Sequence, residues 1–221
     1  MLAGQPEAVR SAMEKTGGGN GRRRLALLKR AMTTTPRIQQ YQGDRRELRP
    51  LFELAEDSAS QLDAYLHLGH VLVALLDDRI VGHLQFVPTG HPQTVEIKNM
   101  AVLKPHQGHG IGRALIESLV ELLAGAPVTA LLVATAAADI DNLRFYQRRG
   151  FRFRSVERDA FTAATGYPGC VVIDGIELRD RVWLDLALPA TGPRVENRDL
   201  LLASRPGLFE AEHCLPHTGL G

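Results

Sequence analysis

The sequence lacks the features that mark several classes of protein. Its 221 residues include only two cysteines, Cys170 and Cys214, without Cys-x-x-Cys spacing, so we expect free thiols rather than a disulfide framework or a zinc site. No apolar run reaches the roughly eighteen residues of a membrane-spanning helix. The start MLAGQPEAVR lacks the apolar core of a secretory signal, so a cytoplasmic protein that does not bind membranes is expected. A formal net charge of +1 argues against nucleic-acid binding.

What the chain does have is enough apolar sequence for one core. A hydrophobic content of 44% at this length favours a single domain with tails. Residues 1–36 hold the basic stretch RRRLALLKRAM between glycine-rich and threonine-rich segments, which predicts a flexible basic extension; a transit peptide or membrane-surface helix is the alternative. Residues 37–188 form the expected domain, and residues 189–221 an irregular tail. Within that tail, His213, Cys214 and His217 lie close together in the sequence, but we do not expect them to bind a metal.

Hydrophobic periodicity and turn residues predict the order of elements inside the domain. Helices are expected at residues 44–58, with Pro50 near the start or at a kink, then from a Ser60 cap to 69, at 111–125 and at 139–150. In the third of these helices, the predicted apolar stripe is Ile111, Leu115, Leu119 and Leu122. Strands are expected at residues 37–42, 71–76, 79–88, 95–103 and 128–134, after Phe151, and at 170–173, 176–179 and 181–188.

A glycine-rich loop follows the predicted strand at residues 95–103 and opens directly into the helix at 111–125. It reads Gln107-Gly108-His109-Gly110-Ile111-Gly112. The first turn of a helix has unpartnered N–H groups and the positive end of the helix dipole, and glycines let phosphate oxygens approach them. The spacing fits neither a P-loop nor a dinucleotide fingerprint, whose third glycine is replaced here by Arg113. The loop is therefore a candidate diphosphate site; a surface turn without a ligand is the alternative.

A second motif lies downstream, where Asn142, Tyr146, Gly150 and Phe151 have the spacing Asn-x-x-x-Tyr-x-x-x-Gly-Phe. Asn142 and Tyr146 share one helix face, and Gly150 suits the left-handed residue that ends a helix. Together with the Gln-x-x-Gly-x-Gly pattern that Gln107, Gly110 and Gly112 form in the loop, these motifs resemble those of the GNAT superfamily of N-acetyltransferases. The resemblance covers about residues 37–188. Within the superfamily, the chain resembles small bacterial members for which no acceptor of the acetyl group is agreed.

The resemblance implies an α/β fold whose mixed, mostly antiparallel sheet splays between strands four and five, with flanking helices. It also implies acetyl-CoA as cosubstrate and no metal. In the family the loop holds the pyrophosphate, the pantetheine pairs with the edge of the fourth strand, and a backbone N–H, here that of Val102, faces the thioester oxygen. The implied cofactor-binding residues are Met100, Ala101, Val102, Gln107, Gly108, His109, Gly110, Ile111, Gly112, Arg113 and Asn142.

Two residues are candidates for the chemistry of acetyl transfer. An alkylamine with a pKa near 10.4 needs about 4.6 kcal/mol to lose its proton at pH 7, so a base is useful. Glu96 resembles the family's catalytic glutamate and is expected to act through a water; a solvent-facing strand glutamate is the alternative, with His83 and His91 as other bases. Tyr146 resembles the tyrosine that hydrogen-bonds the leaving sulfur and acts as general acid. Arg144 and Arg148 join Arg113 as phosphate candidates.

The acceptor is constrained only by charge. Asp159, Asp174, Glu177 and Asp180 make the late connection acidic, which favours a cationic primary amine of a small molecule or peptide; a solvated charged loop is the other interpretation. Two functions of another class stay open. One is an acyl-CoA-binding sensor without turnover, and the other is an interaction protein that works through the basic arm at residues 1–36. A homodimer is also left open.

Overall fold

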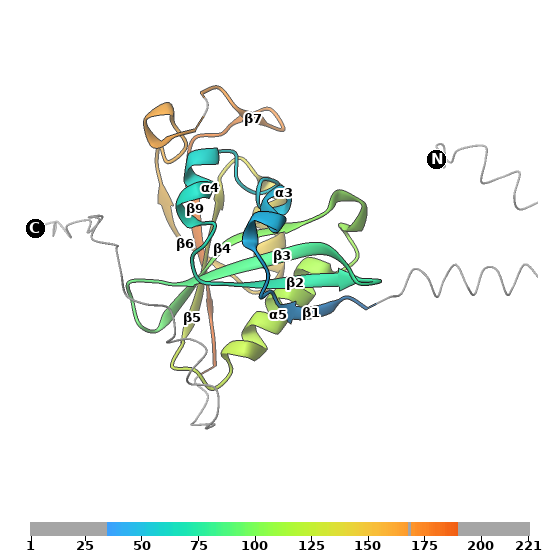
Figure 1. The fold of residues 1–221 in the computed structure, drawn as a ribbon. Coiled ribbons are helices and arrows are strands. Elements are labelled where there is room, and N and C mark those ends of the chain that lie inside the picture. The colour runs from blue at the N-terminus through green and yellow to red at the C-terminus, as the bar shows by residue number, and fades with distance from the viewer. Residues whose placement is uncertain (1–34, 168, 190–221) are drawn as a thin grey trace, which may run out of the picture.

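The structure, a computed structural model, describes residues 35–167 and 169–189, which form a twisted sheet flanked by helices (Figure 1). The basic stretch at residues 22–32 and the cluster His213, Cys214 and His217 lie outside the described residues. The strands are β1 Arg37–Gln40, β2 His70–Leu76, β3 Arg79–Pro88, β4 Thr94–Val102, β5 Ala130–Ala136, β6 Arg152–Glu157, β7 Val172–Ile173, β8 Ile176–Glu177 and β9 Arg181–Ala187. The helices are η1 Arg45–Leu48, α3 Arg49–Phe52, α4 Ala59–Tyr65, η2 Lys104–His106, α5 Ile111–Leu123, α6 Ile140–Arg148 and η3 Ala163–Thr165.

Seven strands form the main sheet in the order β1-β2-β3-β4-β5-β9-β6. All neighbours pair antiparallel except β4 and β5, which are parallel and joined through α5. β7 and β8 form a separate hairpin around Asp174 and Gly175. The mixed, mostly antiparallel sheet predicted from the sequence is confirmed.

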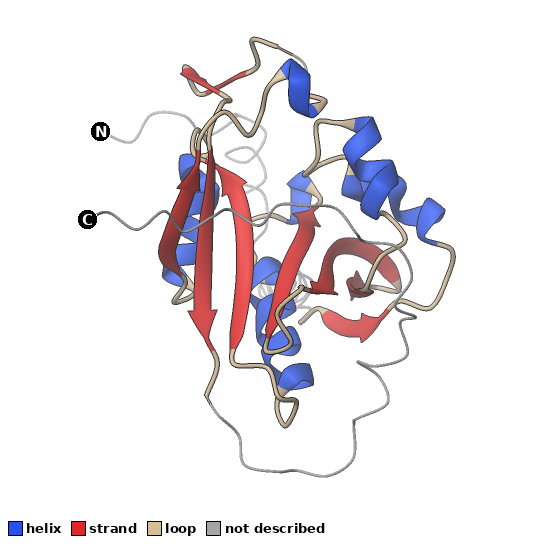
Figure 2. Ribbon diagram, turned by 90° about the vertical axis from the view of Figure 1, so that its left-hand side faces the viewer, coloured by secondary structure: helices blue, strands red, loops and turns tan. Residues whose placement is uncertain are grey.

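The centre of the sheet opens between β4 and β5 (Figure 2). The two strands pair only over Thr94–Ile97 and Ala130–Val133, although β4 continues to Val102 and β5 to Ala136. β4 has one more residue than β3 at the point where the opening begins. Gln85 lies opposite Asn99 and Phe86 opposite Ile97, so Lys98 has no partner on β3 and forms a β-bulge. The remainder of β4 therefore has β3 on one side and no strand on the other.

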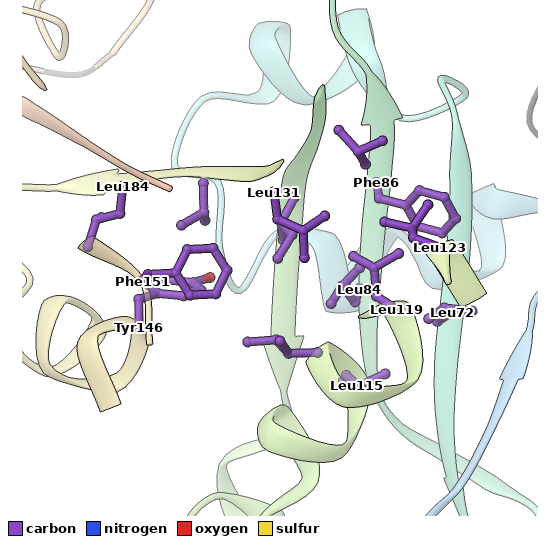
Figure 3. Close-up of a cluster of buried hydrophobic side chains, with 14 of the residues drawn as sticks. Leu72, Leu84, Phe86, Leu115, Leu119, Leu123, Leu131, Tyr146, Phe151 and Leu184 are labelled. Carbon is purple, nitrogen blue, oxygen red and sulfur yellow. The ribbon is translucent and has the colours of Figure 1, made fainter. Parts of the chain in front are cut away.

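Helices cover both faces of the sheet. On one face, α5 buries Leu115, Leu119 and Leu123 against β-strand residues such as Leu84 (Figure 3). Each such leucine contributes about 1.5–3 kcal/mol through the apolar surface it removes from water. The predicted stripe on this helix was right except at its last member, since Leu123 and not Leu122 is buried.

A second cluster fills the other face, where α3 and α4 pack on β2. The predicted helix at 44–58 was too long, because only η1 and α3 form there. Pro50 lies in the first turn of α3, where its missing N–H removes no helical hydrogen bond. The cap of α4 is Ser58 rather than Ser60: its Oγ accepts a hydrogen bond from the Gln61 N–H at 3.3 Å, and Ser60 lies inside the helix.

Candidate active site

A cavity of about 1080 Å³ lies where the sheet opens. Its lining combines the free end of β4, the glycine-rich loop, the end of β5 and helix α6 with the α3–α4 connection and the segment between β6 and β9. All predicted cofactor-binding and catalytic residues except the loop residue His109 line it. Those that line the cavity are Glu96, Met100, Ala101, Val102, Gln107, Gly108, Gly110, Ile111, Gly112, Arg113, Asn142 and Tyr146.

The free end of β4 directs backbone groups into this cavity. The Leu103 N–H donates to the Val81 carbonyl of β3 at 2.9 Å. Because backbone groups alternate in direction along a strand, the N–H groups of Met100 and Val102 point away from β3, to the side that β5 has left. The Val102 carbonyl accepts a hydrogen bond from Gln107 Nε2 at 2.9 Å. This edge can therefore pair with an extended ligand.

The glycine-rich loop presents a bare backbone at the start of α5. Gly108 and Gly110 have φ of 77° and 82°, a left-handed conformation that glycine adopts without strain, and a Cβ on either would meet no atom within 4 Å. Gly110 is the N-cap of α5 and no side chain caps this helix, so the first-turn N–H groups are available to an anion. Gly112 is needed for packing, because its Cβ would lie 3.1 Å from the Phe145 ring.

The other loop residues have separate roles. The Ile111 side chain is buried in the core, so only its backbone can serve a ligand. His109 turns back onto the Gln107 carbonyl, 2.8 Å from Nδ1, and does not line the cavity, so its predicted cofactor contact could come only from its backbone. Arg113 forms an ion pair with Glu117 at 2.7 Å, on a largely exposed helix face.

Helix α6 brings the second motif to the same cavity. Asp139 caps the helix through the Asn142 N–H at 2.8 Å, and its second oxygen accepts a hydrogen bond from the Asn142 side chain. Tyr146 is buried between Phe145 and Phe151, with both rings edge-on at 5.2 and 5.4 Å. Burial, and then the negative charge of Asp139, raise the pKa of Tyr146 well above its ordinary value of 10.0. Its hydroxyl has no hydrogen-bond partner among the described residues and is free to contact a ligand.

Glu96 lies on β4 where β4 still pairs with β5, opposite Leu132. Its side chain is only 16% exposed, and Oε1 accepts a hydrogen bond from Lys98 Nζ at 3.2 Å. Within the described part of the chain, Oε2 has no partner. The strand places this carboxylate in the cavity rather than on an open solvent face.

Several predicted alternatives lie elsewhere. The imidazole of His83 on β3 is fully buried against the Phe52 ring of α3, and His91 lies in the exposed turn between β3 and β4; neither lines the cavity. The four acidic residues of the late connection also do not line it. Asp159 forms an ion pair with Arg179, for example, and the connection contributes apolar and aromatic side chains to the lining instead. These residues are Phe161, Tyr167, Val171, Ile173 and Leu178.

Sequence reasoning missed the α3–α4 connection, from which Glu56 and Asp57 reach the cavity, and the last residue of α4, Tyr65, which also lines it. No motif marks this segment, and its position depends on how α4 packs over the bulge in β4. The two remaining arginine candidates do line the cavity. Arg144 is paired with Asp141 at 2.5 Å, whereas Arg148 has no ion-pair partner among the described residues.

Comparison with known proteins places the chain in a family. The model of the acetyltransferase (GNAT) family matches residues 37–151. The uncharacterized N-acetyltransferase YvbK of Bacillus subtilis (strain 168) is 33% identical over 142 residues, which are 63% of this chain and 90% of that protein. The chain therefore belongs to the GNAT family and is an acyltransferase.

Two solved structures share the fold. An acetyltransferase from Bacillus subtilis in complex with CoA has a TM-score of 0.63 and 32% identity, covering 70% of this chain and 99% of that one. A GNAT family acetyltransferase from Elizabethkingia anophelis with acetyl-CoA bound has a TM-score of 0.64 and 26% identity, covering 71% and 100%. Among the helices that the structure describes, none is long and apolar enough to cross a membrane. The described residues also contain no group of three or more His, Cys, Asp or Glu side chains that could hold a metal ion.

Proposed function

We propose that this protein is an N-acetyltransferase that moves the acetyl group of acetyl-CoA to a primary amine by direct transfer within a ternary complex. The observation that carries the proposal is the joining, in one cavity, of an unpaired β4 edge, an uncapped helix start with two left-handed glycines, and a buried tyrosine hydroxyl. The relatives with bound CoA and acetyl-CoA support the choice of cosubstrate.

The proposed binding mode follows the backbone. The diphosphate lies over Gly108 and Gly110 at the positive end of α5, and the pantetheine arm adds to the edge from Met100 to Val102 by main-chain hydrogen bonds. Cationic side chains near α6, such as Arg148, supply further phosphate contacts. The Val102 N–H then donates to the thioester oxygen. Because this oxygen gains charge as the amine attacks, the bond is stronger in the transition state than in the ground state.

The chemistry needs one proton removed and one sulfur stabilised. Glu96, through a water on its free Oε2, takes the proton from the ammonium group. The nitrogen lone pair then bonds to the acetyl carbon, the carbon–sulfur bond breaks, and the coenzyme leaves as a thiolate that takes up a proton. The raised pKa of Tyr146 suits donation of a hydrogen bond to that sulfur better than full loss of the phenolic proton.

The test is release of coenzyme A from acetyl-CoA across a panel of aminoglycosides, polyamines, amino acids and lysine peptides, with mass spectrometry of the products. Amine-dependent release that Tyr146→Phe reduces would support the proposal. A protein that binds acetyl-CoA with no turnover of any amine would instead favour the acyl-CoA sensor.

A further inference from the structure

The α3–α4 connection places an unusual carboxylate in the cavity. Both oxygens of Glu56 accept hydrogen bonds from uncharged donors: Oε1 from the Ser58 N–H at 3.0 Å and Oε2 from the Tyr65 hydroxyl at 3.2 Å. Glu56 is half-buried, and no cation pairs with it among the described residues. Its neighbour Asp57 also lines the cavity without a cationic partner in this part of the chain. No ion pair among the described residues therefore compensates the Glu56 carboxylate, and the Tyr167 hydroxyl lies close to both Glu56 and Arg181.

A buried chain of hydrogen bonds leads to this carboxylate. Asn99 Nδ2 donates to the Phe52 carbonyl at 3.2 Å and to the Tyr65 oxygen at 2.9 Å. That fixes Asn99 Oδ1 as an acceptor, so His83 donates to it from Nε2, 2.9 Å away. Since the Tyr65 oxygen already receives a hydrogen, its own proton points to Glu56. His83, Asn99 and Tyr65 thus each donate one hydrogen bond in the direction of the carboxylate.

The interior end of this chain carries no charge. His83 is fully buried, and its desolvation lowers its pKa to about 4, so the imidazole is neutral near pH 7. With the proton on Nε2, Nδ1 is an acceptor, and it has no hydrogen-bond partner among the described residues. None of the hydrogen-bonded groups His83, Asn99 and Tyr65 therefore carries a positive charge that would neutralise Glu56.

The rest of this part of the cavity is aromatic, and its cations are already paired. Lys98 forms an ion pair with Glu96 at 3.2 Å, and Arg181 with Glu157 at 3.1 Å. The rings that line the space belong to Tyr65, Phe161, Tyr167 and Trp183. Lys98 already lies 5.4 Å from the centre of the Tyr65 ring and Arg181 5.0 Å from that of Phe161, so Tyr167 and Trp183 are the rings left for a ligand. An unpaired carboxylate beside aromatic rings is a good site for an organic cation.

We infer that Glu56 is a specificity-determining residue that binds a second ammonium group of the acceptor, one that is not acetylated, so that the acceptor is a diamine-type molecule with an apolar spacer. The reacting amine must lose its proton, whereas a carboxylate whose two oxygens are both held by donors is suited to a cation that keeps its charge. Tyr65, Asn99 and His83 act through Glu56 as positioning residues. The inference rests on the proposed amine acetylation.

The first test measures binding, which does not require turnover. Linear alkyl diamines from diaminopropane to diaminooctane, and the monoamine of each length, are titrated calorimetrically into the protein saturated with coenzyme A. We expect at least one diamine to bind the wild type more tightly than its monoamine. Glu56→Gln should weaken that diamine about tenfold to hundredfold, the loss expected for a hydrogen bond to a charged group, and leave the monoamine unchanged.

The control is Glu121→Gln, which removes the same charge from an exposed position on α5 outside the cavity and should leave both affinities as in the wild type. Equal binding of every diamine and its monoamine to the wild type would overturn the inference. So would an equal loss of both on Glu56→Gln, because that result would show a general change in the cavity.

Kinetics with the same amines separates this inference from the proposed function. Diamine binding that depends on Glu56, with no acetylated product from any amine, would refute the transferase and keep the cation site. Acetylation of diamines and monoamines with equal kcat/KM would do the reverse. Tyr65→Phe, which removes the link between Asn99 and Glu56, should reduce the diamine preference without changing the KM for acetyl-CoA; an equal loss for both amines would leave Tyr65 a structural role only.

Discussion

Two glycines in nearly the same conformation allow a sharp test of the glycine-rich loop. Gly110 at the start of α5 has φ of 82°, and Gly175 in the turn between β7 and β8 has φ of 83°. A Cβ on either would meet no atom within 4 Å. Replacing each by alanine should therefore cost the fold about the same, roughly 1–2 kcal/mol, because an L-residue is strained in the left-handed region.

The two variants should differ in binding of acetyl-CoA. If a diphosphate occupies the open space over Gly110, the new methyl group displaces it from the first-turn N–H groups of α5. Loss of two hydrogen bonds to a charged group, at about 1.5–3 kcal/mol each, weakens binding by about a hundredfold or more. Gly175 does not line the cavity, so Gly175→Ala should leave the dissociation constant unchanged.

Urea denaturation and calorimetric titration with acetyl-CoA measure the two quantities separately. We expect equal losses in the free energy of unfolding and a large loss of affinity for Gly110→Ala alone. If Gly110→Ala binds acetyl-CoA as tightly as Gly175→Ala does, the diphosphate does not lie over this glycine and the proposed binding mode is wrong.

Three further changes test other parts of the structure. Tyr146→Phe should lower kcat about tenfold to hundredfold, the loss expected for one hydrogen bond to the charged sulfur, with an unchanged dissociation constant for acetyl-CoA; equal turnover by both proteins would exclude a role for the hydroxyl. Gly112→Val should destabilise the fold by about 1–3 kcal/mol through its clash with Phe145, seen as a lower urea midpoint and refuted by an unchanged one. The pKa of His83, lowered by burial from 6.5 to about 4, makes the unfolded chain bind more protons between these values, so stability falls as pH drops through this window. The loss from pH 7 to pH 5 should be about 2 kcal/mol more for the wild type than for His83→Gln, and equal losses would contradict a neutral buried imidazole.

The cofactor half of the cavity could be predicted from sequence because its information is local. Gly108 and Gly110 lie in one short loop, and their conformations are set by the neighbouring turn and helix start. Asn142 and Tyr146 lie one helical turn apart, so their spacing alone places them on one face. His109 shows where this local reasoning ended: the motif includes it, yet its side chain hydrogen-bonds the preceding turn rather than lining the cavity.

The acceptor half could not be predicted in the same way, because it depends on long-range packing and on one irregularity in β4. Simple alternation would place Asn99 on the α5 face of the sheet with Val95 and Ile97. The bulge at Lys98 turns Asn99 to the opposite face, where it meets Phe52 and Tyr65.

That bulge immediately precedes the free edge of β4 that begins at Met100. One extra residue therefore has two consequences, since it accompanies the separation of β4 from β5 and it brings Asn99 into the chain that ends at Glu56. The strand edge that we propose for the pantetheine and the carboxylate that we propose for the acceptor are fixed by the same local geometry. A change that removed the bulge would be expected to disturb both binding sites together, whereas Glu56→Gln and Gly110→Ala should each disturb only one.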